Sequence, residues 1–151
     1  MILKINPLLL ISGLDINFNF YKLPSNLFEF AWNCVNEKCI GCGKSGIISL
    51  LCLICGKKMC DSNNCKTNTN IVTILSHIET CNGNCIPIIR SSTGEICFFY
   101  QKKFISSGTW VYLNNLGEIP ESYGTINSDY QINESEIHKC EKMFINYSFR
   151  K

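Results

Sequence analysis

A series of closely spaced cysteines, joined by one histidine, constrains this chain more than any other feature of its sequence. The series consists of four ligand pairs: Cys39-x2-Cys42, Cys52-x2-Cys55, Cys60-x4-Cys65 and His77-x3-Cys81. A Cys-x2-Cys turn directs two thiolates at one tetrahedral ion, and two such pairs complete a closed zinc site. The spacing is typical of zinc-binding domains. The sequence therefore predicts one or two structural zinc ions.

A disulfide framework is the alternative use of so many cysteines. The chain has 11 of them, an odd number that suits a secreted disulfide scaffold poorly. Its first residues carry only Lys4 as a charge and lead to no Ala-x-Ala site, so they do not match a signal peptide. No apolar run reaches the ~20 residues that a membrane helix requires. We therefore expect a reduced, cytoplasmic protein that does not contact membranes.

The composition indicates one domain with a substantial core. The 151 residues are 46% hydrophobic, and the formal net charge is only +2. A net charge this close to neutral does not by itself indicate a nucleic-acid partner. Small basic clusters occur at Lys57-Lys58, Lys102-Lys103 and Arg150-Lys151, and we expect them to be solvated surface.

The chain divides into an N-terminal arm, residues 1–24, and a zinc-binding domain, residues 25–151. Within the domain we expect the cysteine module at 39–85, strands at 86–113 and a C-terminal helix at about 134–148. The predicted fold class is α+β: a small zinc-stapled domain with short antiparallel strands and flanking N- and C-terminal helices.

The two flanking helices are predicted from caps and apolar spacing. Ser25 can cap the first, and its apolar residues are expected to pack on the zinc core: Leu27, Phe28, Ala31, Trp32 and Val35. Asn133-x-x-Glu136 resembles a capping box for the second. One stripe of that helix is expected to face the core: Ile137, Cys140, Met143, Phe144 and Tyr147.

The strands are predicted from short apolar runs bounded by turn residues. Ile47–Leu53 indicates a strand that leads into a zinc turn, and residues 71–75 are a β-branched run before His77. Ile86–Arg90 and Glu95–Tyr100 flank a turn and indicate a hairpin. Thr109–Leu113 is expected to be the next strand.

A cross-brace is the expected pairing of the ligands, with alternate pairs sharing an ion. It assigns one ion to Cys52, Cys55, His77 and Cys81. It assigns the other to Cys39, Cys42, Cys60 and Cys65, where Cys34 and Cys85 remain possible competitors. Both sites would be full, which is typical of structural rather than catalytic zinc.

Cys97 and Cys140 are expected in the core. Gly41, Gly43 and Gly56 beside the pairs would let backbone N–H groups turn toward sulfur.

No other chemistry stands out in the sequence. His138 is the only other histidine, and no nucleophile elbow, phosphate loop or carboxylate pair is present. We therefore expect no catalytic residues, no enzyme activity and no small-molecule substrate.

The ordered motifs resemble a known family. Leu51-Cys-Leu-Ile-Cys-Gly56, Met59-Cys60 and His77-x3-Cys81 are similar to the C-terminal domain of UBR-family N-recognin E3 ubiquitin ligases. Lys22-Leu-Pro24 before the first helix, the segment Tyr112–Glu118 and the spaced Tyr130 and Tyr147 extend the resemblance to roughly residues 20–148. The substrate-binding UBR box and the RING of the full ligases have no counterpart here, and the ligand order departs from that of a RING. The resemblance therefore implies a zinc-held domain that packs against other proteins, without ubiquitin transfer.

Three functions remain open at this point. A stand-alone domain of this kind also resembles a microsporidian dormancy factor, which implies a ribosome-associated hibernation protein that blocks a tRNA or mRNA site. Its rRNA contacts would then be Lys102, Lys103, Arg150 and Lys151. The alternatives are an adaptor or remnant of an N-degron ligase, with ubiquitin-ligase components as partners, and a RING-like ligase in its own right.

Overall fold

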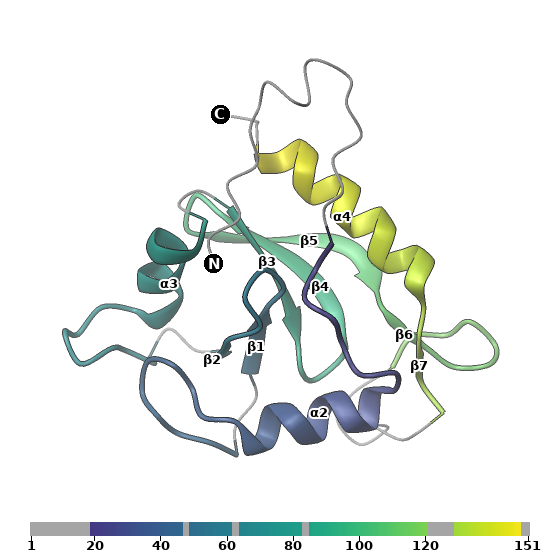
Figure 1. Ribbon diagram of the computed structural model, residues 1–151, viewed down its shortest axis with the longest axis horizontal. Coiled ribbons are helices and arrows are strands. Elements are labelled where there is room, and N and C mark those ends of the chain that lie inside the picture. Colours follow the sequence, from purple (N-terminus) through teal and green to yellow (C-terminus); the bar gives the residue numbers. More distant parts are fainter. Residues whose placement is uncertain (1–18, 47–48, 62–63, 83–84, 121–128, 149–151) are drawn as a thin grey trace.

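A five-stranded antiparallel sheet forms the centre of the molecule in a computed structural model, which describes residues 19–46, 49–61, 64–82, 85–120 and 129–148 (Figure 1). The strand order is β2-β1-β3-β4-β5. The strands are β1 (Ser49–Cys52), β2 (Lys58–Cys60), β3 (Cys85–Arg90), β4 (Glu95–Tyr100) and β5 (Lys103–Trp110). A second, two-stranded sheet pairs β6 (Tyr112–Leu113) with β7 (Gln131–Ile132). The predicted α+β class is confirmed.

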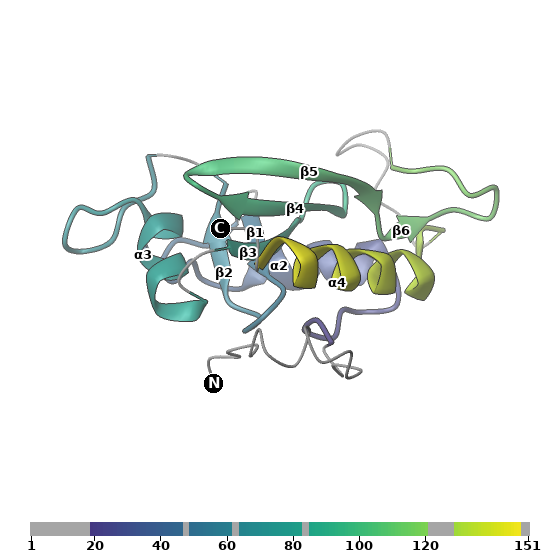
Figure 2. The same ribbon diagram turned by 90° about the horizontal axis from the view of Figure 1, so that it is seen from above.

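Helices pack against side chains on both faces of the large sheet. Helices α2 (Leu27–Asn36) and α4 (Glu134–Ser148) lie on the same side of β4 and β5 (Figure 2). Helix α3 (Thr73–Cys81) packs against the side chains that point to the opposite face. Neighbouring strand residues therefore belong to different cores, as Phe98 and Phe99 of β4 do. Such double coverage explains why the central strands β3 and β4 are largely apolar instead of alternating.

Helix α2 begins one residue later than the sequence indicated. Asn26, not Ser25, is the N-cap, and its side-chain oxygen accepts the Glu29 N–H at 2.8 Å. Ser25 takes another role, because its carbonyl accepts the Ile132 N–H at 2.8 Å and thereby holds the chain to β7.

The prediction for the core-facing side of α2 was right for Leu27 and wrong for Phe28, Trp32 and Val35. The helix buries Leu27, Phe30 and Cys34, whereas Phe28, Trp32 and Val35 are 52%, 60% and 43% exposed. Apolar residues surround much of this helix, so two different stripes satisfy a 3.6-residue period. Contact with the sheet and with Tyr112 selects one of them: the rings of Phe30 and Tyr112 stack with centroids 5.6 Å apart.

The predicted hairpin is confirmed, since β3 and β4 pair across residues 91–94. The position of the third strand was wrong. Strand β5 starts at Lys103, after a two-residue turn in which Gln101 and Lys102 both have positive φ. Non-glycine residues rarely take this conformation, so the turn left little signal in the sequence. Residues 109–113 instead hold the end of β5 and the whole of β6.

The predicted start of helix α4 and its predicted core-facing side are both observed. The Asn133 side-chain oxygen accepts the N–H groups of Ser135 and Glu136. Ile137, Cys140 and Phe144 are buried on the sheet. The side chain of Tyr147 lies outside the described residues. None of the described helices is long and apolar enough to cross a membrane.

Candidate metal centres

The structure gathers the eight predicted ligands into two separate clusters. One, the all-cysteine cluster, contains Cys39, Cys42, Cys60 and Cys65. The other, the histidine-containing cluster, contains Cys52, Cys55, His77 and Cys81. Within each cluster the ligand atoms all lie within 4.8 Å of one another. This is the cross-braced grouping that the sequence predicted.

The all-cysteine cluster is assembled from the loop after α2, the end of β2 and the segment before α3. The sulfur atoms of Cys39 and Cys65 are 3.5 Å apart, and those of Cys42 and Cys60 are also 3.5 Å apart. The Gly41 N–H donates to the Cys39 sulfur at 3.3 Å, as predicted for a glycine beside the pair. Burial opposes ionisation of Cys39, but backbone N–H groups directed at its sulfur lower its pKa to about 6. The loop thus favours the thiolate that a metal requires.

The histidine-containing cluster joins β1 and its following turn to α3. Cys52 ends β1, and Cys55 lies in the turn that Gly56 completes with φ +76°. His77 and Cys81 lie one helical turn apart on α3. The Cys52 and Cys81 sulfur atoms are 3.8 Å apart, and the Cys55 sulfur lies 3.5 Å from His77 Nε2.

Helix α3 was missed from the sequence. The β-branched run at 71–75 favours a strand, and no side-chain cap marks the helix start at Val72. The ligand spacing was the available signal, because a four-residue separation places His77 and Cys81 on one helical face.

The histidine-containing cluster favours the thiolate of Cys55 and the charged ring of His77 through their mutual contacts. The neighbouring Cys52 and Cys81 thiols, together with His77, hold the pKa of Cys55 far below its usual range. Burial disfavours the charged ring of His77, but contacts with Cys55 and Cys81 raise its pKa to about 9. A zinc ion would replace the ring proton and the thiol protons, since zinc binds neutral imidazole and thiolate.

The separations in both clusters fit zinc. Ligands about 2.3 Å from a tetrahedral ion lie roughly 3.8 Å from one another. The sulfur pairs at 3.5 to 3.8 Å match this spacing and are far too long for disulfide bonds. Each cluster could therefore hold a zinc ion with four protein ligands and no open position.

The other cysteines lie in the apolar core. Cys34 and Cys85, the possible competitors for the all-cysteine cluster, are buried with α2 and β3 instead. Burial raises the pKa of Cys34 to about 11 and that of Cys85 to about 12. Cys97 and Cys140 are buried as predicted, and burial raises the pKa of both thiols.

The basic residues identified in the sequence differ in their exposure to solvent. Lys102 and Lys103 are exposed at the β4–β5 turn. Arg150 and Lys151 lie outside the described residues. Lys58 corrects the expectation of a solvated Lys57-Lys58 pair: it is only 1% exposed, and its ammonium donates to the Glu37 carbonyl. Lys58 lies in β2, a strand that is buried along its whole length.

His138 belongs to a clamp that sequence reasoning missed. Its Nδ1 lies 2.7 Å from Glu141 Oε1, and the Phe20 N–H donates to Glu141 Oε2 at 2.5 Å. Glu141 is only 5% exposed. The buried carboxylate thus ties the segment before α2 to α4. No cysteine of the described residues is arranged with His138 as a nucleophile and base.

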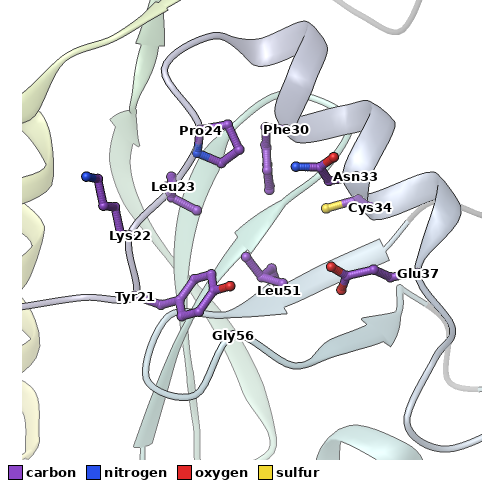
Figure 3. A pocket seen from close by; sticks show the side chains of 10 residues that line it. All are labelled: Tyr21, Lys22, Leu23, Pro24, Phe30, Asn33, Cys34, Glu37, Leu51 and Gly56. Atoms are coloured by element: carbon purple, nitrogen blue, oxygen red, sulfur yellow. The ribbon is translucent and has the colours of Figure 1, made fainter.

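A pocket of about 320 Å³ lies between residues 21–24, α2 and β1 (Figure 3). Leu23, Phe30 and Leu51 provide its apolar surface. Figure 3 shows the Tyr21 hydroxyl and the Glu37 carboxylate approaching from opposite sides, while the ammonium of Lys22 points away. The volume suits one side chain or a small ligand.

The comparisons with known proteins place the chain in a family. A family model described as Proteolysis_6 C-terminal matches residues 4–123, which include both clusters. The chain belongs to this family. It is a family of UBR-type N-recognins, so the resemblance seen in the cysteine motifs is confirmed. A search of the curated proteins found no match.

Proposed function

We propose that this protein is a non-catalytic binding module of UBR type, stabilised by zinc, that docks onto other proteins of a ubiquitin-ligase assembly. The observation that carries the proposal is that both clusters supply four protein ligands each. A closed zinc site has no position for a substrate or an activated water, so its role is to stabilise the fold. Family membership supports the ligase context.

The exposed stripe of α2 is the best docking surface for such a module. Phe28 and Trp32 stack with ring centroids 6.4 Å apart and an interplanar angle of 14°. Both rings are more than half exposed, at 52% and 60%. Aromatic side chains are enriched among the residues that dominate binding energy in protein interfaces. The stripe lies on a helix whose other side is anchored in the core, so it is presented rigidly.

Affinity purification followed by sizing tests this proposal. The wild-type chain should co-purify with ubiquitin-ligase subunits in a large complex, and Trp32→Ala should weaken that association at least tenfold. Leu116→Ala is the matched control, because Leu116 is also apolar and is 82% exposed. A chain that runs alone, or one whose partners are indifferent to Trp32→Ala, would contradict the proposal.

The absence of ligase activity needs its own experiment. Supplied with E1, a panel of E2 enzymes and ubiquitin, the protein should form no more ubiquitin chains than E2 alone. Polyubiquitin chains that vanish in Cys52→Ala would show that it is a ligase.

Ribosome binding is the second candidate, favoured by the exposed Lys102 and Lys103 at the tip of a rigid hairpin. Such a factor would occupy a tRNA or mRNA site on idle ribosomes, with the two lysines on rRNA phosphates. Sucrose gradients at low salt should then place the chain in the monosome peak. Lys102→Glu with Lys103→Glu should release it. Sedimentation at the top of the gradient would exclude this candidate.

A further inference from the structure

Helix α3 connects the two clusters physically. Its first residue, Thr73, is 2% exposed and contacts the all-cysteine cluster, while His77 and Cys81, one and two turns later, belong to the histidine-containing cluster. Residues four apart on a helix share a face. One rigid element therefore carries two ligands of one cluster and begins against a ligand of the other.

Thr73 holds Cys65 in two ways. Its hydroxyl donates to the Cys65 carbonyl oxygen at 3.2 Å, and the hydroxyl oxygen lies 3.1 Å from the Cys65 sulfur. Its backbone N–H donates to the same carbonyl at 3.0 Å. A zinc-bound Cys65 would be a thiolate whose sulfur can only accept a hydrogen bond. The hydroxyl could then turn its single proton from the carbonyl to the sulfur, because the carbonyl would keep the hydrogen bond from the Thr73 backbone N–H.

The Cys39–Cys42 turn packs against the same threonine. A Cβ atom placed on Gly41 would lie only 1.9 Å from the Thr73 hydroxyl oxygen, so the turn touches the helix start closely. Thr73 therefore meets both the Cys65 side and the Cys39–Cys42 side of the all-cysteine cluster. Strand pairing adds a second link, because Cys60 of that cluster pairs with Ser49 of β1, the strand that ends in Cys52.

We propose that Thr73 is a positioning residue that couples the two metal sites, so that zinc at one cluster raises the affinity of the other. Zinc on His77 and Cys81 fixes α3 and thereby places Thr73 against Cys65. The all-cysteine cluster is then already ordered when its own ion arrives, and less conformational entropy is lost on binding. The effect is reciprocal, because the coupling free energy between two sites is shared. The proposal rests on zinc binding by both clusters.

Native mass spectrometry during a Zn²⁺ titration of the reduced, metal-free full chain tests this coupling. Independent sites of equal affinity leave about half of the chains with one ion at one equivalent of metal, and unequal sites leave more. Cooperative sites leave fewer, so the wild-type protein should show mainly chains with no zinc or two. In Thr73→Val the one-zinc form should become the main species, and the coupling factor should fall at least fivefold.

Two further variants separate the hydroxyl from general destabilisation. Thr73→Ser keeps the hydroxyl and should retain the cooperativity. Thr80→Val makes the same change on the same helix, where the hydroxyl donates to the His77 carbonyl at 3.0 Å, and it should titrate like wild type.

Titration with Co²⁺ shows which site fills first, because a ligand set of four thiolates and one that includes an imidazole give different visible spectra. In Thr73→Val the histidine-containing cluster should fill first.

The possible outcomes are distinct. A one-zinc fraction that is no lower in the wild type than in Thr73→Val would overturn the coupling while leaving the zinc-stabilised module intact. The same holds if Thr73→Val titrates like wild type or if Thr80→Val behaves like Thr73→Val. Failure to bind any metal would overturn both this proposal and the proposed function. Where Thr73→Val does not fold, a one-zinc fraction below one half in the wild type still establishes the coupling, because no pair of independent sites gives such a fraction.

Discussion

Gly41 and Gly43 flank Cys42, yet their surroundings differ. Gly41 has the Thr73 side chain against its Cα, and a Cβ atom there would overlap three atoms of that threonine. Gly43 has φ +73° and no atom within 4 Å of a built Cβ. At the first position glycine is required by space, and at the second by backbone conformation.

Gly41→Ala should therefore damage the all-cysteine cluster more than Gly43→Ala does. Overpacking against Thr73 should lower the free energy of unfolding of the zinc-loaded protein by about 1–3 kcal/mol. Gly43→Ala should cost about 1 kcal/mol through strain alone. Denaturant unfolding measures both, and zinc release to a chromophoric chelator should be faster only in Gly41→Ala. Equal release rates would show that the Gly41–Thr73 contact does not hold the cluster.

Cys34 makes the stability depend on pH in the alkaline range. Burial raises its pKa from 9.0 to about 11 in the folded protein. Below pH 9 the thiol is protonated in both the folded and unfolded states, so its contribution is fully present. Between pH 9 and 11 only the unfolded chain loses the proton, which should lower the free energy of unfolding by roughly 2–3 kcal/mol. Cys34→Ala should flatten this decline, and an unchanged slope would rule out Cys34 as its source.

At the scale of elements, one side of α2 packs against the sheet and the other side exposes aromatic side chains to solvent. Leu27, Phe30 and Cys34 hold it to the sheet, while Phe28 and Trp32 face solvent. The two stripes occur on one helix of ten residues. Substitutions on opposite sides should therefore have separable effects on stability and binding.

Phe30→Ala and Trp32→Ala test this separation. Phe30→Ala should lower the free energy of unfolding by about 3–5 kcal/mol, because it leaves a cavity between α2 and Tyr112. Trp32→Ala should change it by no more than about 0.5 kcal/mol, because the ring is 60% exposed. Thermal or urea unfolding of both variants decides this. A large loss in Trp32→Ala would mean that its ring is part of the core.

At the scale of the whole molecule, the clusters join segments far apart in the sequence. The all-cysteine cluster connects the loop after α2 to β2 and the start of α3, and the histidine-containing cluster connects β1 to α3. We therefore expect folding to depend on metal, because the candidate ligands would fix elements that the sequence leaves far apart.

Removal of zinc should therefore unfold the protein. Metal analysis should find one to two zinc ions per chain, and a chelator should abolish cooperative unfolding. Loss of a structural zinc site removes on the order of 10 kcal/mol of folding free energy, so Cys55→Ser should prevent stable folding. Cys97→Ser is the matched control, with an expected cost of about 1–3 kcal/mol from a buried hydroxyl. A metal-free protein with disulfides by mass spectrometry would contradict this prediction.

The sequence by itself determined the features that depend on local spacing. The Cys-x2-Cys turns, the grouping of His77 with Cys81, the β3–β4 hairpin and the cap at Asn133 follow from contacts between residues close in the chain. The four ligand pairs could therefore be predicted, together with the α+β class and the last helix. The sharing of one ion by two distant pairs followed instead from the expected cross-brace.

Only the tertiary structure decided which of several locally acceptable arrangements formed. Both stripes of α2 have helical spacing, and contact with Tyr112 selected the one that contains Phe30. The β-branched run forms α3 because a helix there brings His77 and Cys81 into the cluster and packs its apolar side chains against the sheet. Lys58 is buried because its strand lies inside the fold and its ammonium reaches the carbonyl of Glu37 just after α2. These three features depend on contacts between distant parts of the chain. The spacing of apolar residues within one segment does not reveal such contacts.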